Sequence, residues 1–381
     1  MKNKLSHSAL NKYLTCPKMF NLHYNKRLRG KTTSGALLVG SAIDKAINKM
    51  LEDKVHYYEN INEVLEVFDK EFNFGFINGK YTALAKSENI VYAKRDFDID
   101  LLESEDEDKL KDFWQEKHGP EVFNLENQHK SLLEKKETYG FENLSLEQKQ
   151  LYNYMNWLSM RRKSHLMLKA YQKKVLPKIK QVLAVQKHIL LTGKTGDDIE
   201  CYIDLIVEWE DGKRYVIDNK TSYMQYEQDS PSKSPQLILY NYVANKEGFE
   251  LDGAGFIVMY KMIDKNKIKT CSKCKHDGTG GRHKTCDQTY SETAPFKRCN
   301  GEWIETINPE CKVEVILNPI STEAKNLIIE TYIAANEGIK NKHFGPNPNA
   351  CYQFGNPCVY FDHCWKNKSD DLIQMEEKKN D

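Results

Sequence analysis

The sequence predicts an α/β fold in which a mixed sheet, flanked by helices, carries a large helical insertion and a small cysteine-rich insertion. Three observations support this fold class. Between residues 182 and 220 apolar and polar residues alternate with a period near two, which is typical of strands. Residues 55–181 are highly charged and mostly helical in pattern. Residues 264–312 contain five cysteines and few apolar residues, so they are predicted to form an insertion.

The composition of the chain sets outer limits on its function. A length of 381 residues favours a core domain with insertions, and 40% hydrophobic with 29% charged residues allows a sizeable core. The net charge of +1 neither favours nor excludes nucleic acid, so a binding surface must come from local charge segregation. No apolar run approaches the length of a membrane span, and the amino-terminal segment is too polar for a signal peptide. We therefore expect a cytoplasmic protein with no membrane partner.

Residues 1–54 predict two helices that belong to the core. The first, within residues 6–24, is a short helix capped by Ser6 or Ser8 and stopped at Pro17. In the second, residues 37–51 place apolar side chains at spacings of three and four, which is the pattern of a helix with one buried face. Asp44 lies at the edge of that face, where its carboxylate can point into a cleft.

The helical insertion ends in a basic segment. Residues 160–180 contain eight lysines and arginines, which either follow a phosphate backbone or form a solvated helix face. Core strands follow in residues 182–263, and Ser234 with Pro235 marks the start of a helix among them. After the cysteine-rich insertion, residues 313–381 return to the core with one strand and one capped helix.

A predicted hairpin carries two aspartates and a lysine. Asp204 and Asp218 lie deep in apolar strands, where an unpaired charge is costly, and Lys220 shares the face of Asp218 because strand residues two apart point the same way. With a two-residue turn at Asp211 and Gly212, Asp204 would face away from Asp218. We therefore expect a three-residue loop with a glycine bulge. Such a loop is expected to set Asp204 opposite Lys220 and diagonal to Asp218.

These three groups suit phosphodiester hydrolysis. Carboxylate oxygens are the ligands that Mg²⁺ and Mn²⁺ prefer, and a cation between Asp204 and Asp218 would relieve their repulsion. Such a metal lowers the pKa of a bound water and neutralises a phosphate oxygen. Lys220 is placed to orient the attacking water or to stabilise the charge that develops on the phosphate.

The spacing of these residues resembles the PD-(D/E)XK nuclease superfamily. Gln236 and Tyr240, at i and i+4 on the next helix, make the chain most similar to the RecB-like branch, which includes AddB and the CRISPR-associated RecB-like exonucleases. An amino-terminal pattern of that branch is also matched, by Ser6, Ser8, Leu10, Tyr13, Cys16, Pro17 and Phe20. The resemblance covers about half of the chain and implies a restriction-endonuclease-like core. It implies catalysis by Asp204, Asp218 and Lys220, with Gln236 and Tyr240 lining the site and contacting the substrate.

One position departs from the family pattern. The family has a histidine metal ligand four residues after a glycine, whereas this chain has Asp44 at that place after Gly40. Aspartate also binds Mg²⁺ and Mn²⁺, so activity is compatible with the change. The other interpretation of Asp44 is a surface acid at a helix edge.

Eight of the ten cysteines fall into two groups with the spacing of metal ligands. Three lie in the tail, and the resemblance implies that a fourth near the amino terminus joins them to hold a 4Fe–4S cluster, the set being Cys16, Cys351, Cys358 and Cys364. The three tail cysteines are further apart in the sequence than is common in that branch, so zinc binding, or core thiols that bind no metal, remain as alternatives. The second group fits a zinc ribbon and consists of Cys271, Cys274, Cys286 and Cys299. The remaining two, Cys201 and Cys311, are expected in the core.

The sequence therefore predicts a divalent-metal-dependent DNA nuclease, and an exonuclease is favoured over an endonuclease. Linear DNA, single- or double-stranded, is the expected substrate, in recombination, repair or phage DNA processing, in a bacterial or phage-infected cell. A helicase or recombination protein is a possible partner. Two alternatives remain: a catalytically decayed DNA-binding or recombination-partner protein on the same fold, and a structural metalloprotein that organises such a complex through its zinc module.

Overall fold

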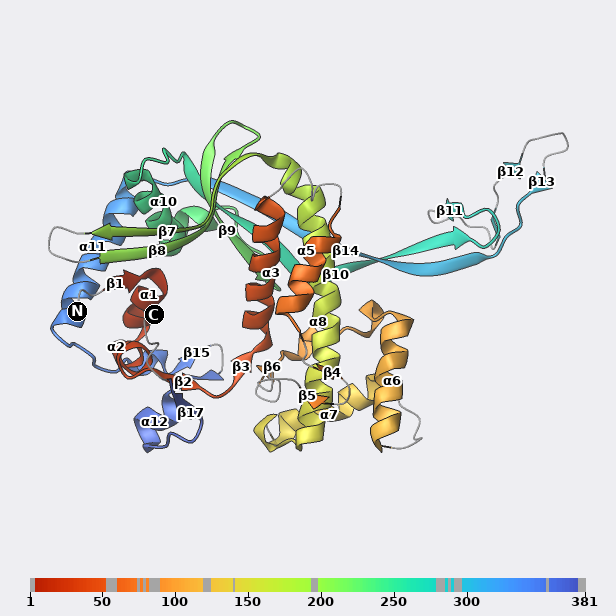
Figure 1. Ribbon diagram of the computed structural model, residues 1–381, viewed down its shortest axis with the longest axis horizontal. Helices are drawn as coiled ribbons and strands as arrows, with labels where there is room; N and C mark the ends of the chain where they lie inside the picture. Colours follow the sequence, from red (N-terminus) through yellow and green to blue (C-terminus); the bar gives the residue numbers. More distant parts are fainter. Residues whose placement is uncertain are drawn as a thin grey trace.

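The fold is taken from a computed structural model, in which residues 4–52, 60–73, 76–77, 80–81, 90–118, 125–139, 141–192, 198–278, 285–286, 289–290, 297–353 and 356–375 are described. Its centre is a mixed sheet with the spatial order β7–β8–β9–β10–β14, which confirms the predicted fold class (Figure 1). Only β9 and β10 run parallel in that series, and β1 adds in parallel to the start of β8. The strands are β1 (Lys4–Ser6), β7 (Ile179–Thr192), β8 (Asp198–Trp209), β9 (Arg214–Ser222), β10 (Gly253–Cys271) and β14 (Trp303–Pro319).

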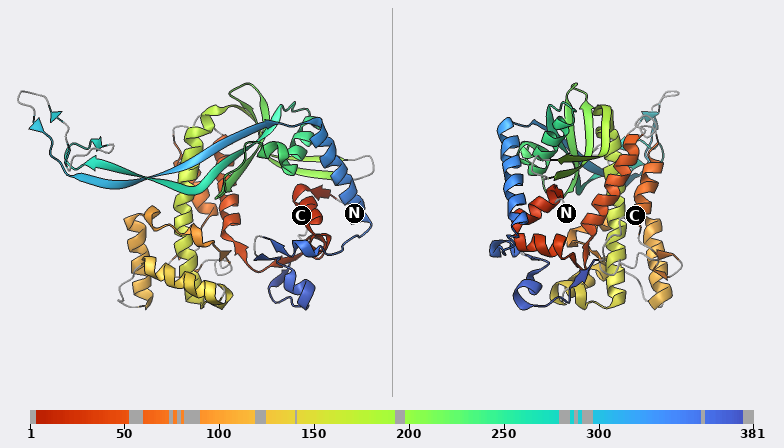
Figure 2. Two further views of the ribbon diagram at one scale, coloured as in Figure 1. Left: turned by 180° about the vertical axis from the view of Figure 1, so that it is seen from behind. Right: turned by 60° about the vertical axis from the view of Figure 1, so that its left-hand side comes forward.

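Helices cover both faces of this sheet, and each face has its own hydrophobic cluster. One cluster is shared with α3 (Gly35–Glu52), α5 (Asn62–Glu71) and α8 (Leu146–Lys174). The other is shared with α1 (His7–Thr15), α10 (Pro235–Lys246) and α11 (Thr322–Lys340). Figure 2 shows α3 and α8 on one side of the sheet and α11 on the other. Cys201 and Cys311 are buried in these clusters, as predicted.

The remaining elements are short or lie outside these layers. The other helices are α2 (Pro17–Phe20), α6 (Ser104–His118), α7 (Leu125–Tyr139), α9 (Ser230–Lys233) and α12 (Phe361–Lys366), with a π-helical turn at Asn21–Asn25 and 3₁₀ turns at Lys94–Asp96, Ile99–Leu101, Phe141–Asn143, Leu176–Lys178 and Pro348–Ala350. Small strand pairs join β2 (Leu28–Gly30) with β17 (Leu372–Gln374), β3 (Thr33–Ser34) with β6 (Ile90–Val91), β4 (Phe76–Ile77) with β5 (Lys80–Tyr81), β12 (Thr289–Tyr290) with β13 (Lys297–Arg298), and β15 (Tyr352–Gln353) with β16 (Asn356–Pro357). A further strand, β11 (Asp277–Gly278), pairs with β10. None of the helices in the described ranges is long and apolar enough to cross a membrane.

Helix starts follow the capping signals of the sequence. The Ser6 hydroxyl accepts a hydrogen bond from the amide of Ala9, and α1 ends at Thr15, just before Pro17. The Ser234 hydroxyl does the same for Leu237 at the start of α10, where Pro235 is the first helical residue. These signals are local, so they predict the boundaries without knowledge of the rest of the fold.

The strands that flank the cysteine-rich insertion are longer than expected. We expected the strand from residue 253 to end near residue 262, but β10 continues to Cys271. Residues 263–271 pair with residues 303–311 of β14 to form a two-stranded arm that projects from the body (Figures 1 and 2). Both faces of such an arm meet solvent, so its sequence lacks the apolar alternation that marks a strand on a core.

The basic segment of α8 is engaged within the protein. Arg161 binds Asp69 through two hydrogen bonds of 2.7 Å, and Arg162 pairs with Asp106. Lys174, at the end of the helix, lies 2.7 Å from Glu310 of the arm. These contacts favour a structural role for Arg161, Arg162 and Lys174 over a track for a phosphate backbone.

Candidate active site

The β8–β9 hairpin has the loop that the chemical hypothesis required. Residues 210–212 form a three-residue loop in which the amide of Gly212 donates to the Trp209 carbonyl at 2.9 Å. Gly212 has a φ of +79°, the left-handed conformation that favours glycine. The strand pairs run from Glu208 opposite Arg214 to Leu205 opposite Ile217.

This register corrects one detail of the prediction. Continued by one residue, it sets Asp204 directly opposite Asp218, not opposite Lys220. The expected diagonal arrangement was wrong because the three-residue loop lies at residues 210–212, whereas a pairing of Asp204 with Lys220 requires it one residue later, at 211–213. Residues directly opposite in an antiparallel pair share a face, so the two carboxylates point the same way.

The site lies where β8 and β9 diverge. Their pairing stops at Leu205 and Ile217, and the start of β8, at residues 198–200, pairs with β1 instead. Residues 201–204 therefore separate two different neighbours of β8. Asp204 is the last of them, and the adjoining α1 begins at His7.

Asp218 and Lys220 form a close ion pair. Asp218 is buried, with 2% of its surface exposed, and its Oδ2 lies 2.5 Å from the Nζ of Lys220. The contact has the distance of an ion pair but not the angles of a hydrogen bond. Burial is the largest single influence on Lys220 and lowers its pKa, but the charge of Asp218, with smaller effects of Tyr226 and Asp204, outweighs it, so the pKa is raised and the ammonium stays charged.

Three carboxylates act on one another in this site. Burial and then the adjacent Asp218 raise the pKa of Asp204 to about 8, and Asp44 adds to the effect. Burial and then the charge of Asp218 raise the pKa of Asp44 to about 6. Without a cation the site thus opposes the ionisation of its own acids. Carboxylates with raised pKa values are suited to bind a divalent cation, because the cation replaces their protons and relieves the repulsion between their charges.

Helix α10 presents the two further residues that the resemblance implies. The Nε2 of Gln236 donates a hydrogen bond of 3.2 Å to the Oη of Tyr240, which is buried. Burial raises the pKa of Tyr240, and the charges of Asp204 and Asp218 contribute, so the tyrosine lies near the two carboxylates. All six positions, Asp44 included, therefore belong to one neighbourhood.

Sequence reasoning missed two residues of this site. The Nε2 of Gln186, on β7, donates to the Oδ1 of Asp204 at 3.3 Å, and Gln186 has a φ of +48°, rare for a residue with a side chain. His7 has a buried Nδ1 with no hydrogen-bond partner among the described residues, and burial, followed by the charge of Lys220, lowers its pKa. His7 follows Ser6 inside the amino-terminal motif, so a signal was present there; nothing in the sequence marked Gln186.

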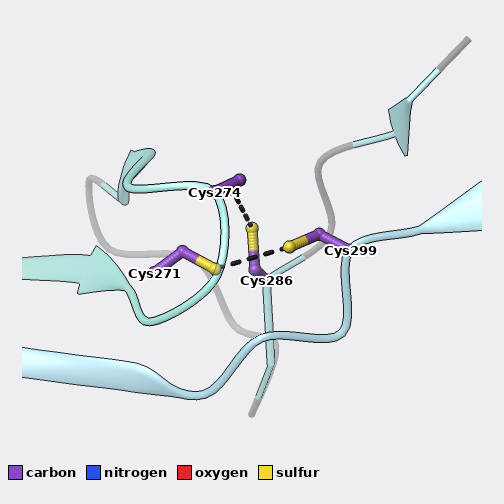
Figure 3. Close-up of side chains that lie close together, drawn as sticks. All are labelled: Cys271, Cys274, Cys286 and Cys299. Atoms are coloured by element: carbon purple, nitrogen blue, oxygen red, sulfur yellow. Dashed lines mark hydrogen bonds between the residues drawn. The ribbon is translucent and has the colours of Figure 1, made fainter.

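The cysteines of the arm meet at its tip, as Figure 3 shows. Their four sulfur atoms lie within 4.8 Å of one another, with 3.5 Å between Cys271 and Cys299 and 3.7 Å between Cys274 and Cys286. Four thiolates around one tetrahedral zinc ion are about 3.8 Å apart, given Zn–S bonds of ~2.3 Å. The group can therefore bind a metal.

The second group of cysteines is more widely spaced. All four line a cavity of about 210 Å³, although they come from opposite ends of the chain: Cys16, Cys351, Cys358 and Cys364. The amide of Asn347 donates to the sulfur of Cys16 at 3.3 Å, and the indole of Trp365 donates to that of Cys351 at 3.3 Å. In the described part of the chain only the group at the arm tip has its ligand atoms within 4.8 Å.

Comparison with known proteins agrees with this site. The sequence profile of the PD-(D/E)XK nuclease superfamily matches residues 108–364, more than half of the chain. The chain belongs to this superfamily, whose members are typically metal-dependent nucleases. None of the curated proteins compared with it matches significantly. The profile includes Asp204, Asp218 and Lys220, but it leaves the branch, the substrate and the roles of these residues open.

Gln186→Leu is expected to raise the Mg²⁺ concentration that half-saturates activity by about 10- to 100-fold, because groups that orient a metal ligand contribute that much to affinity. Cleavage assayed over a metal titration measures it. The matched control is Gln181→Leu, an exposed glutamine on the same strand. An unchanged metal requirement in Gln186→Leu would show that its contact with Asp204 is only structural.

Without divalent metal, the free energy of unfolding should fall between about pH 4 and pH 8 and level off above that. The folded chain keeps a proton on Asp204 up to about pH 8, whereas the unfolded chain releases it near pH 4, so raising the pH favours unfolding in between. Asp204→Asn should flatten this dependence, and Asp370→Asn, at an exposed position, should not. Thermal melts of the metal-free proteins at several pH values measure this dependence. If the Tm of wild type and of Asp204→Asn changed with pH in the same way, Asp204 would not be its cause.

Proposed function

We propose that this protein is a divalent-metal-dependent DNA nuclease with its active site at Asp204, Asp218 and Lys220. One observation carries the proposal: Asp204 lies opposite Asp218 where β8 and β9 diverge, with the Lys220 ammonium 2.5 Å from Asp218. Asp44 completes the group of acids, in the place where the family has histidine. Buried carboxylates with raised pKa values beside a charged lysine are typical of catalytic sites.

The residues of the chain then have separable roles. Asp44, Asp204 and Asp218 would hold Mg²⁺ or Mn²⁺, which when bound activates water and neutralises charge on the phosphate. Lys220 keeps its proton and stabilises the negative charge that develops on the phosphate. Gln186 holds Asp204 in orientation, and Gln236 with Tyr240 positions the nucleic acid.

The two cysteine groups support the assignment to the RecB-like branch. The cavity lined by Cys16, Cys351, Cys358 and Cys364 is wider than a single ion needs and suits a 4Fe–4S cluster, whose sulfur ligands accept hydrogen bonds such as those from Asn347 and Trp365. The pairing of β2 with β17 joins the same two ends of the chain. The tighter group at the arm tip suits zinc.

Linear DNA in recombination, repair or phage DNA processing is the proposed substrate, cut from an end. The test uses end-labelled linear DNA and circular DNA, each single- and double-stranded, with Mg²⁺, Mn²⁺ or a chelator, and protein purified without oxygen. We expect metal-dependent loss of linear DNA only. Cleavage of circles would contradict the exonuclease assignment. Binding without cleavage in either metal would favour a decayed nuclease that serves a helicase or recombination partner.

A further inference from the structure

A group of cations surrounds one tyrosine just beyond the catalytic strand. We call it the Tyr223 cluster; it consists of Arg95, Asp96, Lys163, Tyr223 and Lys261. The guanidinium of Arg95 lies 4.0 Å from the centre of the Tyr223 ring, and the Nζ atoms of Lys163 and Lys261 each lie 5.6 Å from it. The cluster joins the helical insertion to the residue after β9 and to the middle of β10.

Lys261 has no counter-ion that the described residues provide by direct contact. The residue is 4% exposed, and its ammonium faces the Tyr223 ring rather than an ion-pair partner among the described residues. It lies in the irregular stretch between Met259 and Ile263, where the register of β10 against β14 shifts. Such bulges redirect side chains and occur beside active sites. Burying most of a lysine side chain beside two other cations is costly unless an anion balances their charge, so the position of Lys261 needs a reason.

The single acid of the cluster is already engaged. Asp96 accepts hydrogen bonds from the Tyr223 hydroxyl at 2.8 Å and from the Ala93 amide at 2.7 Å. Lys163, 3% exposed, donates to the carbonyl of Arg95, which carries no charge. The nearest other acids, Asp98 and Asp100, pair with Lys265. Three cations thus share one carboxylate, and burial lowers the pKa of both Lys163 and Lys261.

The position of this excess charge relates it to the active site. Tyr223 follows Lys220 by three residues, or about 10 Å of extended chain. A nucleic-acid strand advances ~3.4 Å per nucleotide along a duplex, so this span corresponds to about three nucleotides. Arg95 is exposed, so the cluster reaches the surface.

We propose that the Tyr223 cluster binds a backbone phosphate of the nucleic acid, about three nucleotides from the bond that is cut. The proposal rests on the proposed nuclease function and adds a second anchor to its substrate. The phosphate supplies the missing anion for Lys163 and Lys261, and Arg95 closes over it from the surface. Such a contact positions the strand without reading its bases.

The test compares Lys261→Met with Lys267→Met, which removes the same charge from an exposed position further along β10. Binding of a DNA oligonucleotide is measured over a range of salt concentrations without divalent metal, so that no strand is cut. Loss of one phosphate contact reduces the slope of log K against log salt by about 0.9 for a duplex and ~0.7 for a single strand. We expect this in Lys261→Met alone. The same slope in wild type and Lys261→Met would overturn the proposal.

Thermal melts with inorganic phosphate separate this site from the nuclease assignment. Phosphate should raise the Tm of wild type and of Lys267→Met but not of Lys261→Met, whose own Tm without phosphate should be no lower than that of wild type. Phosphate protection without any DNA cleavage would leave the site intact and refute the nuclease. Protection by phosphate with an unchanged DNA salt slope would mean a free-anion site and refute the proposal. Should Lys261→Met not fold, Lys163→Gln keeps a donor for the Arg95 carbonyl and must reduce the slope in the same way.

Discussion

Lys220→Met is expected to lower the rate of DNA cleavage by about 10²- to 10³-fold, the usual loss when one charge-stabilising donor is removed from an active site. The ammonium lies 2.5 Å from Asp218, and its pKa is raised, so it remains charged at any pH at which the protein is assayed. Methionine retains the length of the side chain and removes only the charge. Single-turnover cleavage under saturating metal measures the chemical step.

Binding separates this effect from misfolding. Lys220→Met should still bind DNA and divalent metal, since Asp44, Asp204 and Asp218 are unchanged. Lys213→Met, at the exposed residue that follows the loop of the same hairpin, is the matched control and should cleave normally. A variant at Lys220 that cleaves as fast as the wild type would remove this lysine from the mechanism.

Substitutions in the two cysteine groups should have different effects on global stability. Cys358→Ser opens the cavity that joins Cys16 to the carboxyl-terminal segment, so we expect loss of the iron–sulfur absorption and a fall in Tm of about 4 °C or more. Cys274→Ser affects only the tip of the projecting arm, so it should release the bound metal and leave the main melting transition in place. Metal analysis, visible absorption and calorimetry on both variants provide the readout.

Cys201→Ser is the control for removal of a buried thiol that binds no metal; it should retain the visible absorption of the wild type. Equal losses of Tm in Cys358→Ser and Cys274→Ser would contradict the division into a core cluster and a peripheral zinc module. Zinc in place of iron in the anaerobically purified wild type would refute the 4Fe–4S assignment while preserving the nuclease assignment.

Much of the site could be predicted because its signals are local. Asp218 and Lys220 share a face by the period of a strand, and Gln236 and Tyr240 share one by the period of a helix. The start of α10 was predicted from Ser234 and Pro235 alone. The need to compensate two buried charges also predicted a three-residue loop at Gly212, which the structure has.

What could not be predicted depends on contacts between distant segments. Gln186 reaches Asp204 only because the register of β7 shifts between Val182 and Ala184, and a register shift leaves no mark in the sequence. The arm was missed because its strands have no core to face. Lys261 resembles any other lysine in the sequence, and only the fold buries it beside Tyr223.

The most direct test of the central claim measures Mn²⁺ binding and DNA cleavage in the same samples of wild type and Asp218→Asn. Asp218 is the acid that contacts Lys220 and lies opposite Asp204. Calorimetry should show that wild type binds Mn²⁺, and the cleavage assay should show that it degrades linear DNA. Asp218→Asn should lose both properties. Metal analysis should show that both proteins retain the metal at the arm tip. Cleavage by Asp218→Asn at the wild-type rate, or tight Mn²⁺ binding by wild type with no cleavage of any DNA, would contradict the account.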